Sequence, residues 1–373
     1  MSPSLMIRPL LAVSTLLFLS GSRLPAAEPA DISASLEPFL NDGKVPGLAA
    51  AVVVDGKIVA AGAAGVRKHG SPEKVTVGDK FHIGSCTKSM TGTLAAMLVK
   101  DGKIKWSSTV AEIFPGLRMN DGYKDATLLQ LCSNTGGVPG DVPPELWNKL
   151  GERREKPEAG ERKELVKGLL EAAPAYPPGK GNTYSNGGFS IAGAMLEKAG
   201  GKSYQELLDA RLFKLLDIRS AGYGAAGNPR KVDQPWGHLL KDGNPEPVPP
   251  GPDADNPPAI TPAGRVHLSV LDFAKYANLH LGTMEKAPLD DKQLDFLHTV
   301  VPPAKDYAVG WVATQRPWAN GVALMHNGTN TMNHAVMWLA PKRKFAVVVM
   351  CNIDDAKACD DVAANLIARF LKQ

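Results

Sequence analysis

The sequence contains none of the short motifs that mark several common classes of enzyme. Its eight histidines form no His-Glu-x-x-His pattern or other metal-ligand spacing, and its four cysteines form no Cys-x-x-Cys pair, so no metal site is predicted. A Gly-x-Ser-x-Gly nucleophile elbow is absent, which argues against an alpha/beta-hydrolase. Leu196 stands where a phosphate-binding loop ending in Gly201-Lys202-Ser203 would need its first glycine. No cofactor is predicted.

Basic runs interleaved with aromatic residues are also absent, so a nucleic-acid partner is not predicted. The net charge of +4 includes Arg8 and Arg23, and residues 1–27 contain no acidic residue; without these two charges the rest of the chain carries +2. With 44% hydrophobic and 21% charged residues, the composition is that of an ordinary soluble globular protein. At 373 residues the chain exceeds what one core usually spans, so two sub-domains are expected.

After residue 27 no hydrophobic run is long enough to cross a bilayer, so no stable membrane span is predicted. The first 27 residues differ from the rest. Arg8 precedes a short apolar segment at 10–19, and small residues follow it between 20 and 27. This order is typical of a bacterial-type export signal, so residues 1–27 are predicted to be a signal peptide and the protein to be periplasmic or secreted. The cleavage point stays open, and an uncleaved anchor is the alternative.

Cysteine is scarce. In an oxidising compartment the four residues could pair, and four cysteines allow three connectivities among which the sequence does not choose. Cys351 and Cys359 are close in sequence and could bridge a strand end to the next helix. Cys86 is predicted to be a small packed residue rather than a nucleophile. The fourth cysteine is Cys132.

Strand-like segments are found at both ends of the chain. An Asp55-Gly56 turn between two apolar runs is the strongest short signal for an antiparallel hairpin. The predicted strands are 48–54 and 57–60 near the start, and 308–312, 335–339 and 344–350 near the end, followed by a helix at 361–371.

Between these ends the patterns are mostly helical. The helices predicted there include 190–199, 204–216 and 269–281, and eight prolines between 245 and 262 predict a long surface loop. The fold class is therefore α/β (α+β): an antiparallel sheet built from N- and C-terminal strands and flanked by helices, with an inserted mainly helical sub-domain. Within a domain covering 31–370, we expect residues 31–84 and 300–370 to form the sheet sub-domain and residues 85–299 the helical one.

A Ser-x-x-Lys sequence begins the first strongly periodic apolar run. Ser85 is predicted at the N-terminus of a helix that stops at Asp101-Gly102. Residues three apart share a helix face, so Ser85 and Lys88 would lie together. A serine nucleophile needs a nearby base, and a lysine can serve when burial lowers its pKa from about 10.4. A four-residue Ser-x-x-Lys pattern is by itself a weak signal for a catalytic site.

Two further clusters carry groups suited to acyl transfer. Tyr184-Ser185-Asn186 follows a Pro- and Gly-rich loop and leads into a helix, and His326-Asn327-Gly328 lies between strand-like runs before Thr329. A tyrosine beside a lysine can relay protons, and an asparagine amide can bind a substrate carbonyl or amide. A glycine at a strand edge lets a substrate approach the backbone.

With these three clusters in this order, the sequence resembles the serine beta-lactamase/penicillin-binding-protein superfamily, most closely its class C beta-lactamase-like branch. The marks of that family are Ser-x-x-Lys, Tyr-x-Asn and a strand-borne Lys-Thr-Gly or His-x-Gly. Flanking stretches at 128–139, 176–179 and 339–341 are also similar, with Asn134 where the family usually has histidine. The resemblance covers roughly residues 31–370.

The resemblance implies a role for each matched residue. Ser85 would attack a carbonyl and form an acyl-enzyme, and Lys88 and Tyr184 would share the acid–base duty. Asn186 would hold the acyl-side amide of the substrate. The backbone N–H groups of Ser85 and Thr329 would form the oxyanion hole.

One departure bears on the substrate. His326 and Asn327 replace the lysine and the hydroxyl residue that contact a carboxylate in classical beta-lactamases, and a histidine is mostly neutral at pH 7. The sequence therefore predicts an exported serine hydrolase acting on an ester, amide or lactam, of the esterase or D-Ala peptidase type, on small molecules or cell-wall peptides. The alternatives are a true beta-lactamase and a non-catalytic protein that binds cell-wall fragments.

Overall fold

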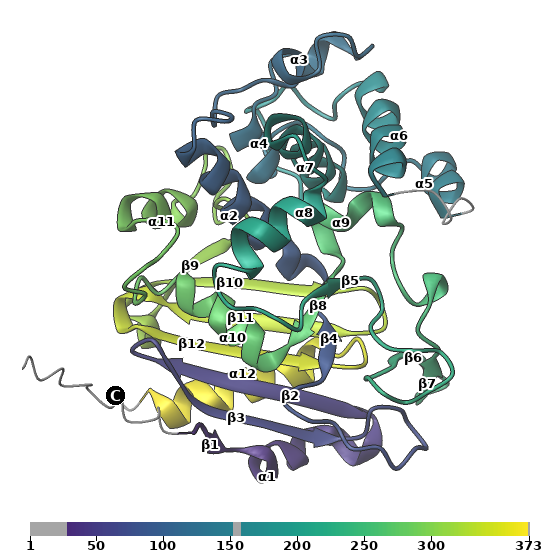
Figure 1. The fold of residues 1–373 in the computed structure, drawn as a ribbon, viewed down its shortest axis with the longest axis vertical. Coiled ribbons are helices and arrows are strands. Elements are labelled where there is room, and N and C mark those ends of the chain that lie inside the picture. The colour runs from purple at the N-terminus through teal and green to yellow at the C-terminus, as the bar shows by residue number, and fades with distance from the viewer. Residues whose placement is uncertain (1–27, 152–157, 372–373) are drawn as a thin grey trace, which may run out of the picture.

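The computed structural model describes residues 28–151 and 158–371, so the predicted signal peptide lies outside the described residues. Its largest sheet has seven strands in the order β1-β3-β2-β12-β11-β10-β9, and all neighbours are antiparallel except β1 and β3 (Figure 1). Strands from the two ends of the chain meet where β2 pairs with β12, with Val52 opposite Val347. The predicted fold class is confirmed. The bounds are β1 Ala30–Asp31, β2 Gly47–Val54, β3 Lys57–Gly65, β9 Val312–Arg316, β10 Gly321–Thr329, β11 His334–Ala340 and β12 Phe345–Cys351.

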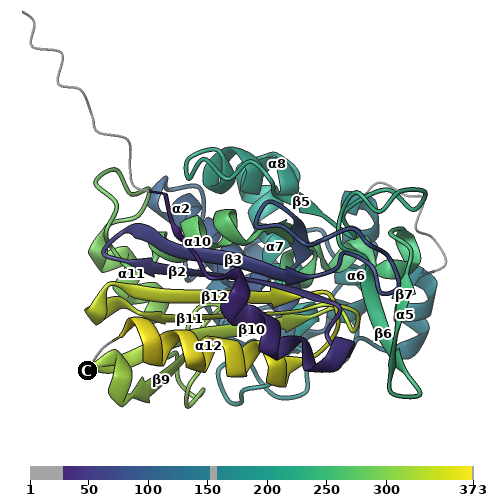
Figure 2. The same ribbon diagram turned by 90° about the horizontal axis from the view of Figure 1, so that it is seen from below.

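Both faces of this sheet are covered. Helix α12 (Ala356–Phe370) lies along one face, and the helical region that contains α2 and α10 lies on the other (Figure 2). In β2, Ala49, Ala51 and Val53 belong to the core on the α2 side, whereas the alternate residues of β2 belong to the core on the α12 side. A strand buried on both sides has no polar face, which explains its unbroken apolar sequence.

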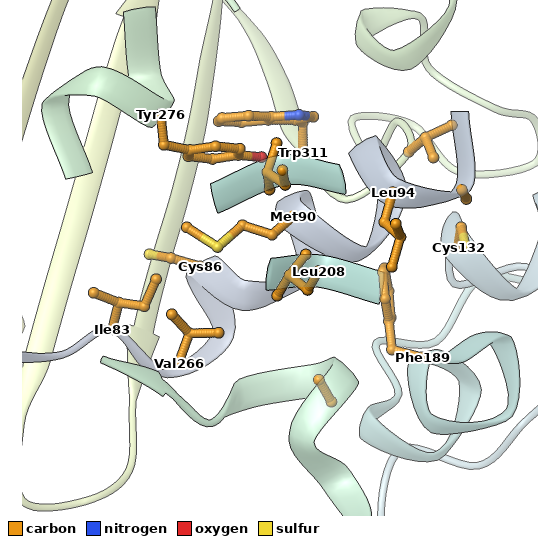
Figure 3. Close-up of a cluster of buried hydrophobic side chains, with 14 of the residues drawn as sticks. Ile83, Cys86, Met90, Leu94, Cys132, Phe189, Leu208, Val266, Tyr276 and Trp311 are labelled. Atoms are coloured by element: carbon orange, nitrogen blue, oxygen red, sulfur yellow. The ribbon is translucent and has the colours of Figure 1, made fainter. Parts of the chain in front are cut away.

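Helix α2 (Thr87–Lys100) is the centre of the helical region. Every residue from Thr87 to Leu98 is buried, so the helix is surrounded on all sides. Met90 and Leu94 pack among residues from other helices and loops, including Phe189, Leu208 and Trp311 (Figure 3). The other helices are α1 Ser33–Leu36, α3 Val110–Ile113, α4 Leu128–Cys132, α5 Pro144–Gly151, α6 Glu158–Glu171, α7 Asn186–Gly200, α8 Tyr204–Leu208, α9 Thr261–Gly264, α10 Val270–Leu279 and α11 Asp291–His298.

Two small sheets complete the structure. Strands β4 (Lys80–His82), β8 (Val266–Ser269) and β5 (Gly222–Tyr223) form one, next to the start of α2. The other is the hairpin of β6 (Gly237–Lys241) and β7 (Asn244–Val248). The proline-rich stretch is therefore only partly a loop, because β7 includes two of its prolines in a two-stranded sheet where every strand is an edge.

The predicted strand 57–60 and helix 190–199 are too short, because β3 extends to Gly65 and α7 begins at Asn186. Three other predicted boundaries are wrong. Residues 308–311 form no strand, and β9 begins at Val312; the apolar run is buried because Gly310 packs against the backbone of α2 and Trp311 enters the helical core. Helix α2 begins at Thr87, because a 3-10 turn, Gly84–Cys86, precedes it. The last helix begins at Ala356, where the side chain of Asp355 caps it by accepting from the N–H of Ala358.

All four cysteines are buried thiols, and the Sγ atoms of Cys351 and Cys359 lie 3.4 Å apart. Within residues 28–151 and 158–371, no helix is both long enough and apolar enough to cross a membrane. The same residues bring together no group of three or more metal-ligating side chains.

Candidate active site

Ser85 lies in the 3-10 turn between β4 and α2, directly against strand β10. Two glycines allow this contact. A Cβ on Gly328 would lie 2.3 Å from the backbone nitrogen of Ser85, and a Cβ on Gly84 would lie 2.3 Å from the backbone nitrogen of Thr329. Gly84 also has a left-handed φ of 49°. Only glycine at both positions brings the N–H groups of Ser85 and Thr329 onto neighbouring segments.

Lys88 is buried one turn beyond Ser85, with no side-chain exposure. Its Nζ donates to Ser85 Oγ at 3.1 Å, to Asn186 Oδ1 at 2.7 Å and to the carbonyl oxygen of Ala263 at 2.8 Å. The last two bonds come from α7 and α9, which close over the amine. Three acceptors use the full donor capacity of an ammonium group, and they hold the nitrogen against the serine oxygen.

Burial also changes the basicity of Lys88. Removal of water around the amine lowers the pKa of Lys88 well below its usual 10.5, and the nearby Cys86 opposes this only weakly. The aromatic ring of Tyr184 lies 4.6 Å from Nζ. An amine that loses its proton readily, within hydrogen-bond distance of a hydroxyl, can accept the proton of that hydroxyl.

Tyr184 lies beside the same serine, in the loop that leads into α7. The side chain is 43% exposed, so one side of it faces solvent. Desolvation raises the pKa of Tyr184 above its usual value, and a hydrogen bond with Ser85 lowers it in part. The phenol is therefore protonated at neutral pH and can donate a proton, while the amine of Lys88 is the stronger candidate for accepting one.

His326 lies behind the tyrosine and does not face the open part of the site. Its imidazole is buried, with Nε2 3.1 Å from the hydroxyl of Tyr307 and Nδ1 2.6 Å from the carbonyl oxygen of Asn327. Burial, and then the nearby Lys88, lower the pKa of His326 to about 3. The ring is therefore neutral and provides no cation. The ring of Tyr184 is 6.3 Å away, centroid to centroid.

Asn327 lies on the opposite face of β10. Neighbouring residues of a strand point to opposite faces, and Asn327 pairs with Val336, a core residue on the α12 side. The structure thus brings Ser85, Lys88, Tyr184 and Asn186 together with the Gly328–Thr329 backbone. It places His326 one layer behind them and directs Asn327 away.

The model of the Beta-lactamase family matches residues 32–372, which is most of the chain. The chain belongs to the Beta-lactamase family. Its members are serine hydrolases, and the serine, lysine and tyrosine described above stand in the order that the family motifs require.

Individual relatives are distant. The protein flp of Staphylococcus aureus (strain N315) is 23% identical over 340 residues, which cover 89% of this chain and 65% of flp, so the chain spans just under two thirds of that relative. The octameric penicillin-binding protein homologue from Pyrococcus abyssi has a TM-score of 0.72 at 21% identity, covering 90% of this chain and 75% of its own. The beta-lactamase/D-alanine carboxypeptidase from Pseudomonas syringae has a TM-score of 0.73 at 18% identity, covering 90% and 97%. These structures share the fold.

In this Beta-lactamase family member, Ser85 opens onto a cleft of about 470 Å³. Asn186 and Thr329 also line it. Among the described residues that line the cleft, none is a lysine or arginine, and the one charged side chain is Asp141. The lining residues that sequence reasoning missed include Trp147, Asn148, Asn256, Ile260 and Asn330.

Asn134, which helps to position the segment that carries Tyr184, was also hard to identify from the sequence. Asn134 has a left-handed φ of 61° and accepts a hydrogen bond of 3.0 Å from the backbone N–H of Ser185. The one available signal was its place in the 128–139 stretch, where the family usually has histidine.

Proposed function

We propose that this protein is an exported serine hydrolase. An ester, amide or lactam acylates Ser85, and water then hydrolyses the acyl-enzyme. The single observation that carries the proposal is the buried amine of Lys88, which lies 3.1 Å from Ser85 Oγ and whose pKa is lowered well below its usual value by burial. A lysine is costly to bury, and activation of a nucleophile is a reason to do so. The reactive groups of all three motifs argue against a role limited to binding.

The reaction would proceed in two proton-balanced steps. Ser85 Oγ attacks the substrate carbonyl while its proton passes to Lys88, and Tyr184 delivers a proton to the leaving group. The negative oxygen of the tetrahedral intermediate would lie between the N–H groups of Ser85 and Thr329, each donor contributing about 3–4 kcal/mol in comparable sites. Water then attacks the acyl-enzyme and gives a proton to Tyr184, while Lys88 returns its proton to Ser85 Oγ.

The neutral His326 and the cleft lining favour substrates without a carboxylate beside the scissile bond. A lysine at the position of His326 would offer a cation, whereas the observed histidine is buried and uncharged. We therefore place an esterase activity ahead of a D-alanyl carboxypeptidase or a dedicated beta-lactamase, because the substrates of both carry such a carboxylate. The name of the Pseudomonas syringae relative pairs beta-lactamase with carboxypeptidase activity, so lactam hydrolysis is the second candidate.

Covalent labelling tests the nucleophile. We expect a fluorophosphonate probe to add one phosphonyl group per molecule, mapped by mass spectrometry of peptides to Ser85, and Ser85→Ala to abolish the adduct. Ser89→Ala is a matched control, because Ser89 lies in the first turn of α2, just after the turn that carries Ser85, but is fully buried and donates to the carbonyl oxygen of Cys86. An adduct on another residue, or an adduct that survives Ser85→Ala, would refute the assignment.

A matched pair of peptide esters tests the substrate class. In one of them the C-terminal carboxylate beside the leaving group is free, and in the other that same carboxylate is methylated. We expect the methylated substrate to be hydrolysed at least as fast, because no described lining residue offers a cation. His326→Lys should raise the relative kcat/KM for the carboxylate form. A preference of the unmodified protein for the carboxylate of about tenfold, near 1.4 kcal/mol, would contradict this part of the proposal.

A further inference from the structure

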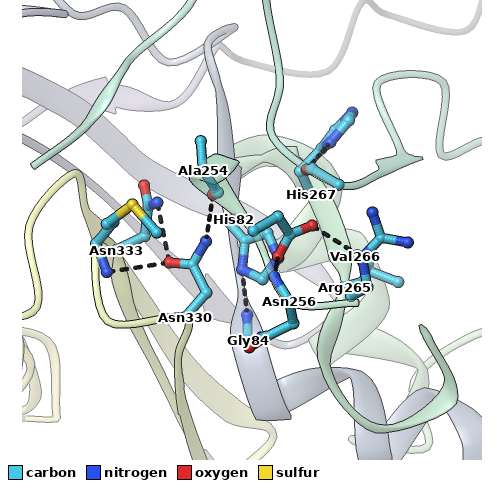
Figure 4. Close-up of polar contacts among 12 residues, drawn as sticks. His82, Gly84, Ala254, Asn256, Arg265, Val266, His267, Asn330 and Asn333 are labelled. Atoms are coloured by element: carbon cyan, nitrogen blue, oxygen red, sulfur yellow. Dashed lines mark hydrogen bonds and ion pairs between the residues drawn. The ribbon is translucent and has the colours of Figure 1, made fainter. Parts of the chain in front are cut away.

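A buried polar network lies behind the turn that carries Ser85, and the proposed chemistry does not use it (Figure 4). At its centre, a carboxylate oxygen of Asp255 lies 2.9 Å from His82 Nε2, and both side chains are 2% exposed. The other oxygen accepts from Arg265 Nε at 3.0 Å. Burial alone would raise the pKa of Asp255, but a hydrogen bond from His82 and the charge of Arg265 hold it below its usual value. The carboxylate is therefore charged and fully enclosed, which is costly unless it has a role.

The contacts of His82 fix the position of its proton. The backbone N–H of Gly84 donates to His82 Nδ1 at 3.0 Å, so Nδ1 carries no hydrogen. The proton of the neutral imidazole must lie on Nε2, the nitrogen that faces Asp255. Asp255 thus keeps His82 in the tautomer that can accept from Gly84. A side-chain acceptor bonded to the N–H two residues later is the geometry of an Asx turn, with a ring nitrogen in place of an asparagine oxygen.

The same segment also contacts the other half of the site. The carbonyl oxygen of Ala254 accepts from Asn330 Nδ2 at 3.2 Å, and Asn330 directly follows Thr329 (Figure 4). The backbone N–H of Asn256 donates to Asp255 at 2.7 Å, and Asn256 lines the cleft. Residues 254–256 therefore contact His82, which bonds to the turn that carries Ser85, and Asn330, which directly follows β10. These are the two segments that carry the proposed oxyanion donors.

We propose that Asp255 and His82 are positioning residues that hold the Ser85 N–H in register with the Thr329 N–H. This rests on the proposed function, because the two residues act only through the oxyanion hole. Gly84 adopts a left-handed conformation that a glycine leaves easily, so a fixed acceptor on its N–H adds to the other hydrogen bonds that restrain the turn. Donors misplaced by about 1 Å lose about 100-fold in rate.

Three substitutions separate the links of this network, with kcat and KM measured on the ester that the unmodified protein hydrolyses best. His82→Leu removes the acceptor, and we expect kcat to fall about 100-fold with KM changed less than about twofold. His82→Asn keeps an acceptor for Gly84, so kcat should recover to within about fivefold. Asp255→Asn weakens the hold on the tautomer and should lower kcat about tenfold.

His267→Gln is the matched control. His267 pairs with His82 across β4 and β8 and is largely buried, but its Nδ1 bonds to the carbonyl oxygen of Gly224, away from the serine turn. We expect its kcat to stay within about twofold even where its melting temperature falls, since it holds no oxyanion donor. Melting temperatures of all variants separate a lost fold from a lost alignment.

The outcomes distinguish the two proposals. Wild-type kcat in His82→Leu, or a loss in His82→Asn as large as in His82→Leu, overturns the positioning role. If His82→Leu does not fold, Asp255→Asn is the deciding variant. An unchanged kcat in Asp255→Asn then overturns the positioning role. A wild-type protein that neither reacts with a fluorophosphonate nor hydrolyses any ester refutes the proposed function itself.

Discussion

Replacing Lys88 with methionine is expected to lower kcat/KM for any ester substrate by about 10³-fold or more, the range for a lost general base. Methionine fills the same buried volume and carries no proton acceptor. The amine now bonds to Ser85 Oγ, to Asn186 Oδ1 and to the carbonyl oxygen of Ala263, and all three bonds would be lost. Lys88→Arg should be equally inactive, because a guanidinium does not lose its proton at working pH. Steady-state kinetics with a melting curve for each variant measures the effect.

The pH dependence of the unmodified protein checks the same role. Catalysis requires the uncharged amine, so kcat/KM should be low below the pKa of Lys88 and rise as the pH passes it. Burial lowers that pKa well below 10.5, so the rise should be complete before pH 10.5. The pKa of Tyr184 is raised, so the phenol should stay protonated over this range. A kcat/KM that stays constant from the acid limit of the protein's stability up to pH 10.5 would contradict the role of Lys88.

Replacing Gly328 with alanine is expected to lower kcat/KM by about 100-fold or more and to destabilise the fold by roughly 1–3 kcal/mol. The added Cβ would lie 2.2 Å from the carbonyl oxygen of Ile83, 2.3 Å from the nitrogen of Ser85 and 2.8 Å from the nitrogen of Cys86. All three are backbone atoms and have no other rotamer to adopt. Strand β10 must therefore move away from the serine turn, which separates the two proposed oxyanion donors.

The control for this change is Gly116→Ala. Gly116 has no atom within 4 Å of an added Cβ and no left-handed φ, so alanine should leave both activity and stability nearly unchanged. Kinetics and chemical denaturation of the two variants provide the comparison. A Gly328→Ala protein with wild-type kcat/KM would show that the close contact between β10 and the turn does not serve catalysis.

The elements that the sequence predicts well are those with a local signal. The Asp55-Gly56 turn marks the β2–β3 hairpin, and the helix predicted at 190–199 lies within α7. The run at 308–312 gives a false strand because apolar residues record burial, not hydrogen bonding. In the fold, residues 308–311 are buried in a loop against α2. A short apolar run has the same sequence pattern whether it is buried in a loop or in a strand.

The residues of the candidate site likewise divide into properties with a local sequence signal and properties that depend on packing. Ser85 and Lys88 could be paired from their spacing, because a one-turn separation at a helix start is a local property, and Tyr184 and Asn186 could be named from the family resemblance of their motif. The low basicity of Lys88 could not, since it depends on α7 and α9 closing over the amine. The motif at 326–328 indicated a strand, but only the packing shows that His326 is buried behind Tyr307 and that Asn327 points to the other face.

By itself, then, the sequence determined the chemical types available for catalysis and their order along the chain. The tertiary structure decided their charge states, the close contact of β10 with the serine turn, and the pairing of His82 with Asp255 from a distant loop. The physical reason is that a sequence pattern records periodicity and local propensity. Desolvation and the register between remote segments arise only when the chain packs.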